Sequence, residues 1–229
     1  MVYIIAGDRI NVRQARGLPD RRLHWEQKEQ GVRWLGEQIG ERIGAECRYV
    51  AGKPVEAVLD ADGRILGFEY EPEEAVWPAE IEASPSDTVV LLDSGIAAQP
   101  RFPSTAGVTV AYLSEKNFAL LKQVADPSRV VPLMTMDTLR HEGAAVSKRI
   151  SWEKTLTDFA REFQFGIVGQ RLGTFPRFIV LMESEGMLVY DRGQLTFLYL
   201  PSKLEGDHRP RRISGTALNL MAPAVSIFA

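Results

Sequence analysis

The chain has 229 residues, 45% of them hydrophobic and 25% charged, which is the composition of an ordinary globular domain with a full core. Its 27 basic and 30 acidic side chains give a net charge of -3, without the basic surplus of a nucleic-acid-binding protein, so we expect no nucleic-acid partner. The single cysteine, Cys47, excludes an internal disulfide, and no apolar run approaches the roughly 18 residues of a membrane span. We therefore expect a cytoplasmic protein with no membrane partner.

The N-terminal segment predicts a strand, a loop and a helix. Val2–Ala6 is an unbroken apolar run that meets Gly7–Asp8, which is typical of a buried strand that ends in a turn. A polar loop is expected next. From residue 25 to residue 46 the apolar positions, among them Leu35 and Ile39, recur at helical spacing, so this stretch predicts one long helix.

A hairpin and a linker follow this helix. Two apolar stretches in residues 53–71 flank the turn signal Asp60-Ala61-Asp62-Gly63, and this pattern predicts a β-hairpin. Residues 72–87 combine acidic side chains with prolines, which is typical of a linker.

The second half of the chain alternates strands and helices. A short helix is expected around residues 116–124, and a longer one begins at Trp152 after the N-cap Ser151. Pro132 lies inside one predicted strand, and it favours a position at the edge of the sheet. The predicted strands are Thr88–Leu92, Val108–Leu113, Arg129–Met134 and Phe178–Met182.

The last elements are a second hairpin and an apolar end. Met187–Tyr190 and Leu195–Leu200 flank a turn at residues 191–194, and Ser214–Ala229 predicts an apolar helix distorted by Pro223. We expect this helix to pack on the sheet or on a partner. The alternation as a whole predicts an α/β fold in one domain, 1–229, with a mainly parallel central sheet and helices on both faces.

Seven short motifs follow one another along nearly the whole chain. They are Gly7-Asp8, Gln30-Gly31, Ile39–Val50, Val89–Gly95 (VVLLDSG), Met134–Arg140, Phe178–Tyr190 (FIVLMESEGMLVY) and Ile213–Leu218 (ISGTAL). Their order resembles that of ribokinase-like (PfkB-type) carbohydrate and nucleoside kinases. In that family the hairpin region supplies a lid, so residues 53–71 are expected to form a lid-like insertion.

A second resemblance concerns the middle of the chain. Residues 137–159, with the core SKRISWEKT, are similar to kinase-like domains of bacterial proteins that also carry a ryanodine-receptor-type repeat.

The resemblance implies a binding site for a small molecule and a nucleotide. Two of its residues also follow from strand position, because Asp8 and Asp93 are expected to end adjacent strands on the side where open α/β sheets bind ligands. The alternative is that they only cap loops. The candidate small-molecule ligands are Asp8, Asn11, Gly31 and Asp93, and the candidate nucleotide or phosphate ligands are Asp137, Arg140, Glu183, Gly186, Gly215 and Thr216.

The implied cofactor is ATP or another nucleotide with Mg²⁺, and no protein-held metal is expected. Gly215-Thr216 precedes a predicted helix, whose free N–H groups favour phosphate; a plain turn into a helix is the alternative.

Departures from the family pattern weaken the case for catalysis. The family's Asn-x-x-Glu motif, which organises Mg²⁺ and phosphate, reads Asp137-Thr138-Leu139-Arg140 here, and the position of the general base falls on Leu218. A leucine accepts no proton from a substrate hydroxyl, so we expect no catalytic residue. Only 11 residues follow Leu218, so the chain is expected either to be part of a longer protein, with a missing C-terminal region as its partner, or to have lost that part.

Three functions remain open at this point. The first is a catalytically inactive, regulatory ribokinase-like domain that binds a small molecule, such as a nucleotide or nucleoside, or a protein partner. The second is an active ATP-dependent kinase that phosphorylates a hydroxyl of a sugar or nucleoside. The third is a structural protein-interaction module.

Overall fold

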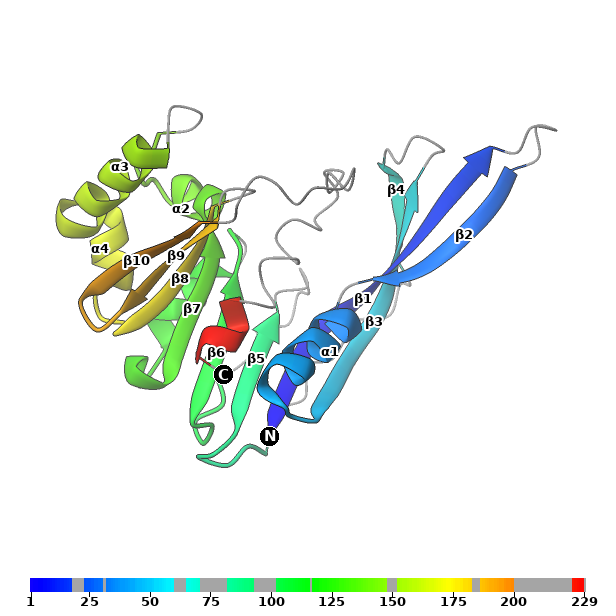
Figure 1. Ribbon diagram of the computed structural model, residues 1–229, viewed down its shortest axis with the longest axis horizontal. Coiled ribbons are helices and arrows are strands. Elements are labelled where there is room, and N and C mark those ends of the chain that lie inside the picture. Colours follow the sequence, from blue (N-terminus) through cyan, green and yellow to red (C-terminus); the bar gives the residue numbers. More distant parts are fainter. Residues whose placement is uncertain are drawn as a thin grey trace.

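The computed structural model describes residues 1–17, 23–30, 32–59, 65–70, 82–92, 102–115, 117–147, 152–182, 186–199 and 224–228. Within these ranges ten strands form one sheet in the order β10-β9-β8-β7-β6-β5-β1-β3-β4, with β2 paired to β1 (Figure 1). The strands are β1 Val2–Gly17, β2 Leu23–Gln30, β3 Cys47–Leu59, β4 Ile65–Tyr70, β5 Thr88–Leu92, β6 Val108–Leu113, β7 Val130–Thr135, β8 Arg177–Met182, β9 Gly186–Asp191 and β10 Gln194–Tyr199. The helices are α1 Val32–Ile43, α2 Met136–His141, α3 Trp152–Phe165 and α4 Ile167–Leu172, with 3-10 helices η1 Phe118–Gln123 and η2 Pro127–Arg129.

The sheet is mainly parallel, as the alternation of elements predicts. Strands β3, β1, β5, β6, β7 and β8 run parallel to their neighbours, and antiparallel pairing occurs at β2, β4, β9 and β10. The chain therefore has the α/β fold expected from its sequence. No helix of the described ranges is long and apolar enough to cross a membrane.

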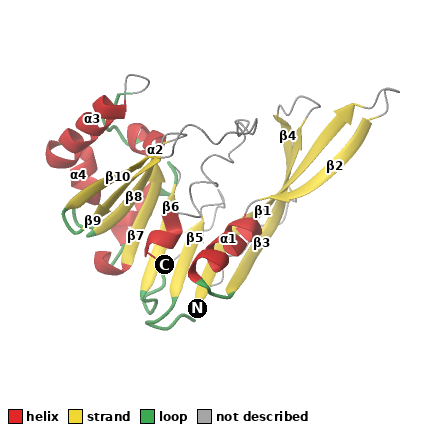
Figure 2. Ribbon diagram, viewed as in Figure 1, coloured by secondary structure: helices red, strands yellow, loops and turns green. Residues whose placement is uncertain are grey.

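Both faces of the central strands are apolar, and each face is covered by its own helices. Val89 of β5 belongs to one buried cluster, together with Phe159 of α3. Its neighbour Val90 points the other way, into a cluster with Ile39 of α1 and Val225. Successive side chains of a strand point to opposite faces of the sheet. A strand whose residues are all apolar therefore needs other elements packed on both of its faces. In Figure 2, α1 and the helical residues 224–228 both lie in front of the strands.

The C-terminal prediction is confirmed for the residues that the structure describes. Residues 224–228 are helical, and Ala224 and Val225 are fully buried against the sheet. Ala224 and Val225 thus belong to the core of this chain, whereas Ile227 is exposed. Pro223 and the preceding residues lie outside the described ranges.

The predicted turn at Gly7–Asp8 is wrong. β1 continues through both residues to Gly17, with Asp8 opposite Lys53 of β3 and Ile10 opposite Gln30 of β2. The sequence after Asp8 alternates apolar and polar residues, which is the pattern of a half-buried strand, and two neighbouring strands satisfy its backbone groups.

The predicted helix at residues 25–46 is right only for its second part. Residues 25–30 belong to β2, which is antiparallel to β1 and places Trp25 opposite Ala15, whereas α1 spans Val32–Ile43. The glutamate, glutamine and lysine residues of β2 favour helix by intrinsic propensity. Pairing along the projecting part of β1 overrides that preference, because propensity is a weak term beside tertiary context.

The hairpin predicted at residues 53–71 is confirmed, and it belongs to a larger unit. β3 and β4 pair antiparallel, with Val55 opposite Tyr70. The far halves of β1 and β3 pair with each other beyond the main sheet, and β2 and β4 flank them. We call residues 10–17, 23–30, 55–59 and 65–70 the arm; it projects from the body of the molecule (Figure 1).

Strand β7 occupies the centre of the sheet, although its proline favoured an edge. Pro132 lies opposite Ala111 of β6, and the pairing of β7 with β8 begins one residue later, at Leu133 opposite Ile179. The missing N–H of the proline therefore falls before the start of the β8 ladder. A proline is accommodated in a central strand where one neighbour has not yet begun to pair.

The C-terminal hairpin follows the sequence prediction closely. β9 and β10 pair antiparallel, and the residues between them are Arg192, with φ 46, and Gly193, with φ 96. Positive φ at both central positions defines the two-residue turn that matches the twist of a hairpin, and glycine adopts it without steric cost.

An aromatic cluster under α3 generates a stability prediction. Phe159 is 0% exposed, whereas Phe165 on the same helix is 76% exposed. Phe159→Ala should lower the free energy of unfolding by about 3–5 kcal/mol, because it leaves a cavity beside Phe178. The matched control Phe165→Ala should change it by less than about 0.5 kcal/mol. Urea denaturation of the two variants tests this, and equal losses would contradict the packing described here.

Candidate functional site at the carboxyl edge of the sheet

The parallel strands bring several of the predicted site residues to one edge of the sheet. β7 ends at Thr135, and Asp137 lies in the first turn of α2 directly after it. Gly186, with φ 146, begins β9 after β8 ends at Met182. Carboxyl ends of parallel strands lie at the same edge, which is where open α/β sheets bind ligands.

The backbone of Asp8 lies at the same edge, although it does not end a strand. β1 pairs with β5 as far as Ala6 opposite Leu92, so Asp8 lies just beyond the end of β5. Three strand spacings separate β1 from β7, which places Asp8 about 14 Å from the end of β7 across the sheet. Asn11 is different: it lies in the arm, opposite Glu56 of β3 and Glu29 of β2.

The other predicted site residues lie outside the described ranges. They are Gly31, Asp93, Glu183, Gly215 and Thr216, together with Leu218 at the expected position of the base.

A threonine cap starts the helix that carries Asp137 and Arg140. Thr135 has extended backbone, and its Oγ1 accepts a hydrogen bond from the backbone N–H of Thr138 at 3.1 Å. A threonine in this conformation satisfies one of the free N–H groups of the first turn. The cap fixes the direction of α2 where β7 ends, so Asp137 and Arg140 stay at the edge.

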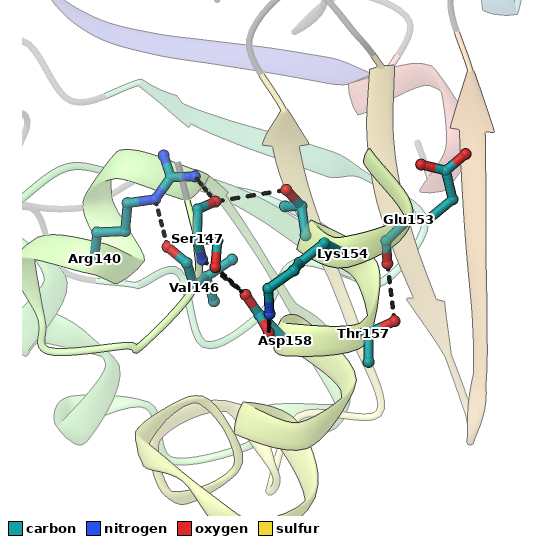
Figure 3. A network of polar contacts seen from close by, with 8 residues as sticks. Arg140, Val146, Ser147, Glu153, Lys154, Thr157 and Asp158 are labelled. Atoms are coloured by element: carbon teal, nitrogen blue, oxygen red, sulfur yellow. Dashed lines mark hydrogen bonds and ion pairs between the residues drawn. The ribbon is translucent and has the colours of Figure 1, made fainter. Parts of the chain in front are cut away.

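Arg140 holds three oxygen atoms of its own chain. Its Nη1 donates to Asp137 Oδ1 at 2.8 Å. Its Nε donates to the Val146 carbonyl at 3.1 Å and its Nη2 to the Ser147 carbonyl at 2.9 Å (Figure 3). These bonds tie the segment after α2 back to the start of the same helix. A guanidinium carries five N–H donors, so the three bonds leave two donors for a further acceptor.

A second carboxylate holds the same segment from the side of α3. Asp158 accepts hydrogen bonds from Lys154 Nζ at 2.8 Å, from the Ser147 backbone N–H at 3.1 Å and from the Ser147 hydroxyl (Figure 3). The bond from Lys154 and then those from Ser147 lower the pKa of Asp158 to about 2. Ser147 is therefore held by Arg140 through its carbonyl and by Asp158 through its N–H and hydroxyl.

Sequence reasoning did not find this network. It identified Asp137 and Arg140, but it missed Asp158, Lys154 and Ser147. The available signal was the four-residue spacing of Lys154 and Asp158 on a predicted helix, which is favourable for an ion pair. Their attachment to Ser147 depends on how α3 packs, and no local pattern shows that.

No dedicated metal site is found in the part of the chain that the structure describes. There, no three histidine, cysteine, aspartate or glutamate side chains come together as potential ligands of one ion.

The strand order, the helices on both faces and the projecting arm define a ribokinase-like fold, and solved structures confirm it. The chain is similar to phosphofructokinase-2 from Escherichia coli in its tetrameric inhibited form, with a TM-score of 0.54 and 12% identity over 100% of this chain and 88% of that one. It is also similar to the ribokinase of Cryptococcus neoformans in complex with ADP, with a TM-score of 0.51 and 12% identity over 100% and 88% of the two chains.

A third similar structure is the ribokinase of Arabidopsis thaliana complexed with ribose and ATP. Its TM-score is 0.53 and its identity 8%, over 98% of this chain and 85% of that one. No protein-family model matches the sequence, and no curated protein does so either. The fold expected from faint motifs is thus confirmed, at sequence identities that show the fold alone.

The Asp158 network predicts how stability depends on acid. The usual pKa of aspartate, near 3.9, applies to the unfolded chain, so a folded value of about 2 contributes stability that is present above about pH 4. This contribution is lost as the pH falls toward 2. Asp158→Asn should therefore lose stability at neutral pH, and its melting temperature should fall less steeply than that of the wild type between pH 4 and pH 2.

Asp87 provides the comparison for this experiment. Bonds from the N-terminal amine and from Ser84 lower the pKa of Asp87 to about 2 as well. The stability of the single variant Asp158→Asn therefore still falls in part between pH 4 and pH 2. The double variant Asp87→Asn/Asp158→Asn should have the flattest profile. An Asp158→Asn protein with the acid profile of the wild type would show that this network adds no stability.

Proposed function

We propose that this chain is a ribokinase-like domain that binds a nucleotide at the carboxyl edge of its sheet and does not transfer the phosphoryl group. In this proposal the domain has a regulatory role and spans residues 1–229, with the arm as its lid. Two of the similar structures are complexes with ADP and with ATP, which supports a nucleotide as the ligand.

The observation that carries the proposal is the position of Arg140. The resemblance aligns it with the glutamate of the family's Asn-x-x-Glu motif, which organises Mg²⁺. Here a guanidinium replaces that carboxylate, and it pairs with Asp137 at 2.8 Å. A fixed positive charge repels a divalent cation. The same charge, with two N–H donors left over, suits the oxygens of a phosphate.

Mg²⁺ would arrive with the nucleotide, and Asp137 is the carboxylate that pairs with Arg140. Its Oδ1 already accepts the bond from Arg140, which partly neutralises its charge. Phosphoryl transfer depends on positioning and on charge neutralisation by metal ions and donors. Binding through Arg140 and weak placement of Mg²⁺ therefore fit a domain that senses a nucleotide better than one that consumes it.

Leu218 supports the same conclusion from the sequence. It aligns with the family's general base, and general-base catalysis contributes typically about 10²–10⁴-fold to rate. The loss of base and metal placement together would bring transfer to a small alcohol down to background. In addition to Arg140, Gly215 and Thr216 remain the proposed phosphate contacts.

The test separates binding from catalysis. Titration calorimetry with ATP, with and without Mg²⁺, should show binding, while a coupled assay over a panel of sugars and nucleosides should show no turnover. Arg140→Gln should weaken ATP binding about tenfold, since a hydrogen bond to a charged group is worth about 1.5–3 kcal/mol.

Arg129 is the matched control for this variant. It also pairs with an aspartate three residues earlier, Asp126, and donates to a backbone carbonyl, but it lies before β7 and therefore at the opposite end of the strand. Arg129→Gln should leave ATP binding unchanged. Asp158→Asn should also retain most of it, because it loosens the Ser147 segment but keeps the cation.

Three outcomes would contradict the proposal. Turnover that disappears on substitution of Asp8, Asp93 or Asp137 would show an active kinase with a displaced base. Equal losses of ATP binding in Arg140→Gln and Arg129→Gln would remove Arg140 from the site. The absence of any nucleotide binding would leave the interaction module as the function.

A further inference from the structure

A cavity of about 380 Å³ is lined by residues of η1, η2 and α4, by the end of α2 and by two residues that precede β8. Val124 and Pro127 line it just before β7, and Thr174 and Phe175 line it just before β8. The cavity is thus beside the amino ends of these strands. Asp137 and Arg140 lie on α2, which follows the carboxyl end of β7, and Glu142 at the end of the same helix also lines the cavity. Helix α2 therefore connects the carboxyl edge to the cavity.

The inner wall of the cavity is apolar and well fixed. Phe118, Leu121 and Phe175 line it, and all three are buried members of the hydrophobic core. Small-molecule sites are typically concave, mostly apolar and about 300–1,000 Å³ in volume. The size of this cavity lies near the lower limit of that range, so it has room for a small molecule.

The charged residues of the wall are Lys122, Arg171 and Glu142. Two cations and one anion leave a net charge of +1. In the described part of the chain, Lys122 and Arg171 form neither a hydrogen bond nor an ion pair with another side chain, although many other charged side chains do. These two cationic side chains can pair with an anionic group of a ligand, and the aromatic side chains of the wall can contact its apolar part.

Close helix packing holds Arg171 beside the cavity. A Cβ on Gly169 would lie 2.0 Å from the carbonyl oxygen of Phe163, so α4 approaches the end of α3 as only a glycine permits. Arg171 is two residues further along α4 and is half-buried. The position of its backbone is therefore set by the packing of α4 against α3.

We propose that this cavity is a second small-molecule site, and that it binds a monocarboxylate with an aromatic or branched aliphatic body. The carboxylate lies between Lys122 and Arg171, and the apolar body lies on Phe118 and Phe175. The site is distinct from the nucleotide site proposed above, because neither Asp137 nor Arg140 lines the cavity.

The experiment uses the whole chain and the probe 3-phenylpropanoate, with the neutral 3-phenylpropanamide beside it. Ligand-observed NMR titration should show saturable binding of the acid at millimolar concentrations and at least tenfold weaker binding of the amide. Arg171→Gln and Lys122→Gln should each weaken binding of the acid severalfold, and Ala119→Trp, which fills the cavity from an exposed position on η1, should abolish it.

Two control variants keep the proposal falsifiable. Arg161→Gln removes an exposed arginine of α3 outside the cavity, and Arg140→Gln removes the cation of the other site; both should leave binding of the acid unchanged. Melting temperatures of all variants identify any that fail to fold. The proposal is overturned by no binding of the acid, by equal binding of acid and amide, or by equal effects of Arg171→Gln and Arg161→Gln.

Discussion

The structure depends on one constraint: strands β5 to β8 are apolar on both of their faces. Val90, Val131, Leu133 and Ile179 point to one side, while Val89, Met134 and Phe178 point to the other, and all of them are buried. Each buried side chain of this size contributes roughly 1.5–3 kcal/mol relative to exposure. A sheet of this kind is stable only between two helical layers, so α1 and residues 224–228 cover one face and α3, α4 and η1 the other.

This constraint also determines where polar chemistry is possible. When both faces of a sheet are covered, the strand ends remain the regions where polar side chains and backbone groups meet solvent. At the carboxyl edge, β7 leads directly into the Thr135 cap and then to Asp137 and Arg140. At the amino edge, the returning helices leave the cavity beside Lys122 and Arg171. The same layered packing thus produces the two regions for which we propose ligands.

Arg140 illustrates how one side chain determines the polar contacts at the carboxyl edge of the sheet. Three bonds to Asp137, Val146 and Ser147 make the guanidinium a structural element of the turn after α2. Asp158 and Lys154 reinforce this turn from α3. The carboxyl edge therefore carries a well-fixed guanidinium, paired with Asp137, at a position where the ribokinase resemblance expects a carboxylate. A rigid cation is well suited to hold an anion and poorly suited to organise a divalent metal ion.

The sequence by itself determined the central sheet, because its strands are short, continuous apolar runs. Such a run must be buried, and this excludes an exposed helix or loop at these positions. Thr88–Leu92, Val108–Leu113 and Phe178–Met182 were predicted to within a residue of β5, β6 and β8. The turn at Arg192-Gly193 followed from residue type in the same way. Of the candidate site, the sequence located Asp137 and Arg140 through motif order, and Asp8 through the end of an apolar run.

Only the tertiary structure decided the arm and the polar network. Residues 8–17 and 23–30 carry polar and helix-favouring side chains, and they become strands because each supplies the backbone partners that the other lacks. Pro132 is central because β8 begins to pair one residue later. Asp158 reaches Ser147 because the packing of α3 against Phe178 brings residues 11 positions apart into contact. Such contacts depend on how segments far apart in the sequence pack against each other. Local sequence patterns carry no information about that packing.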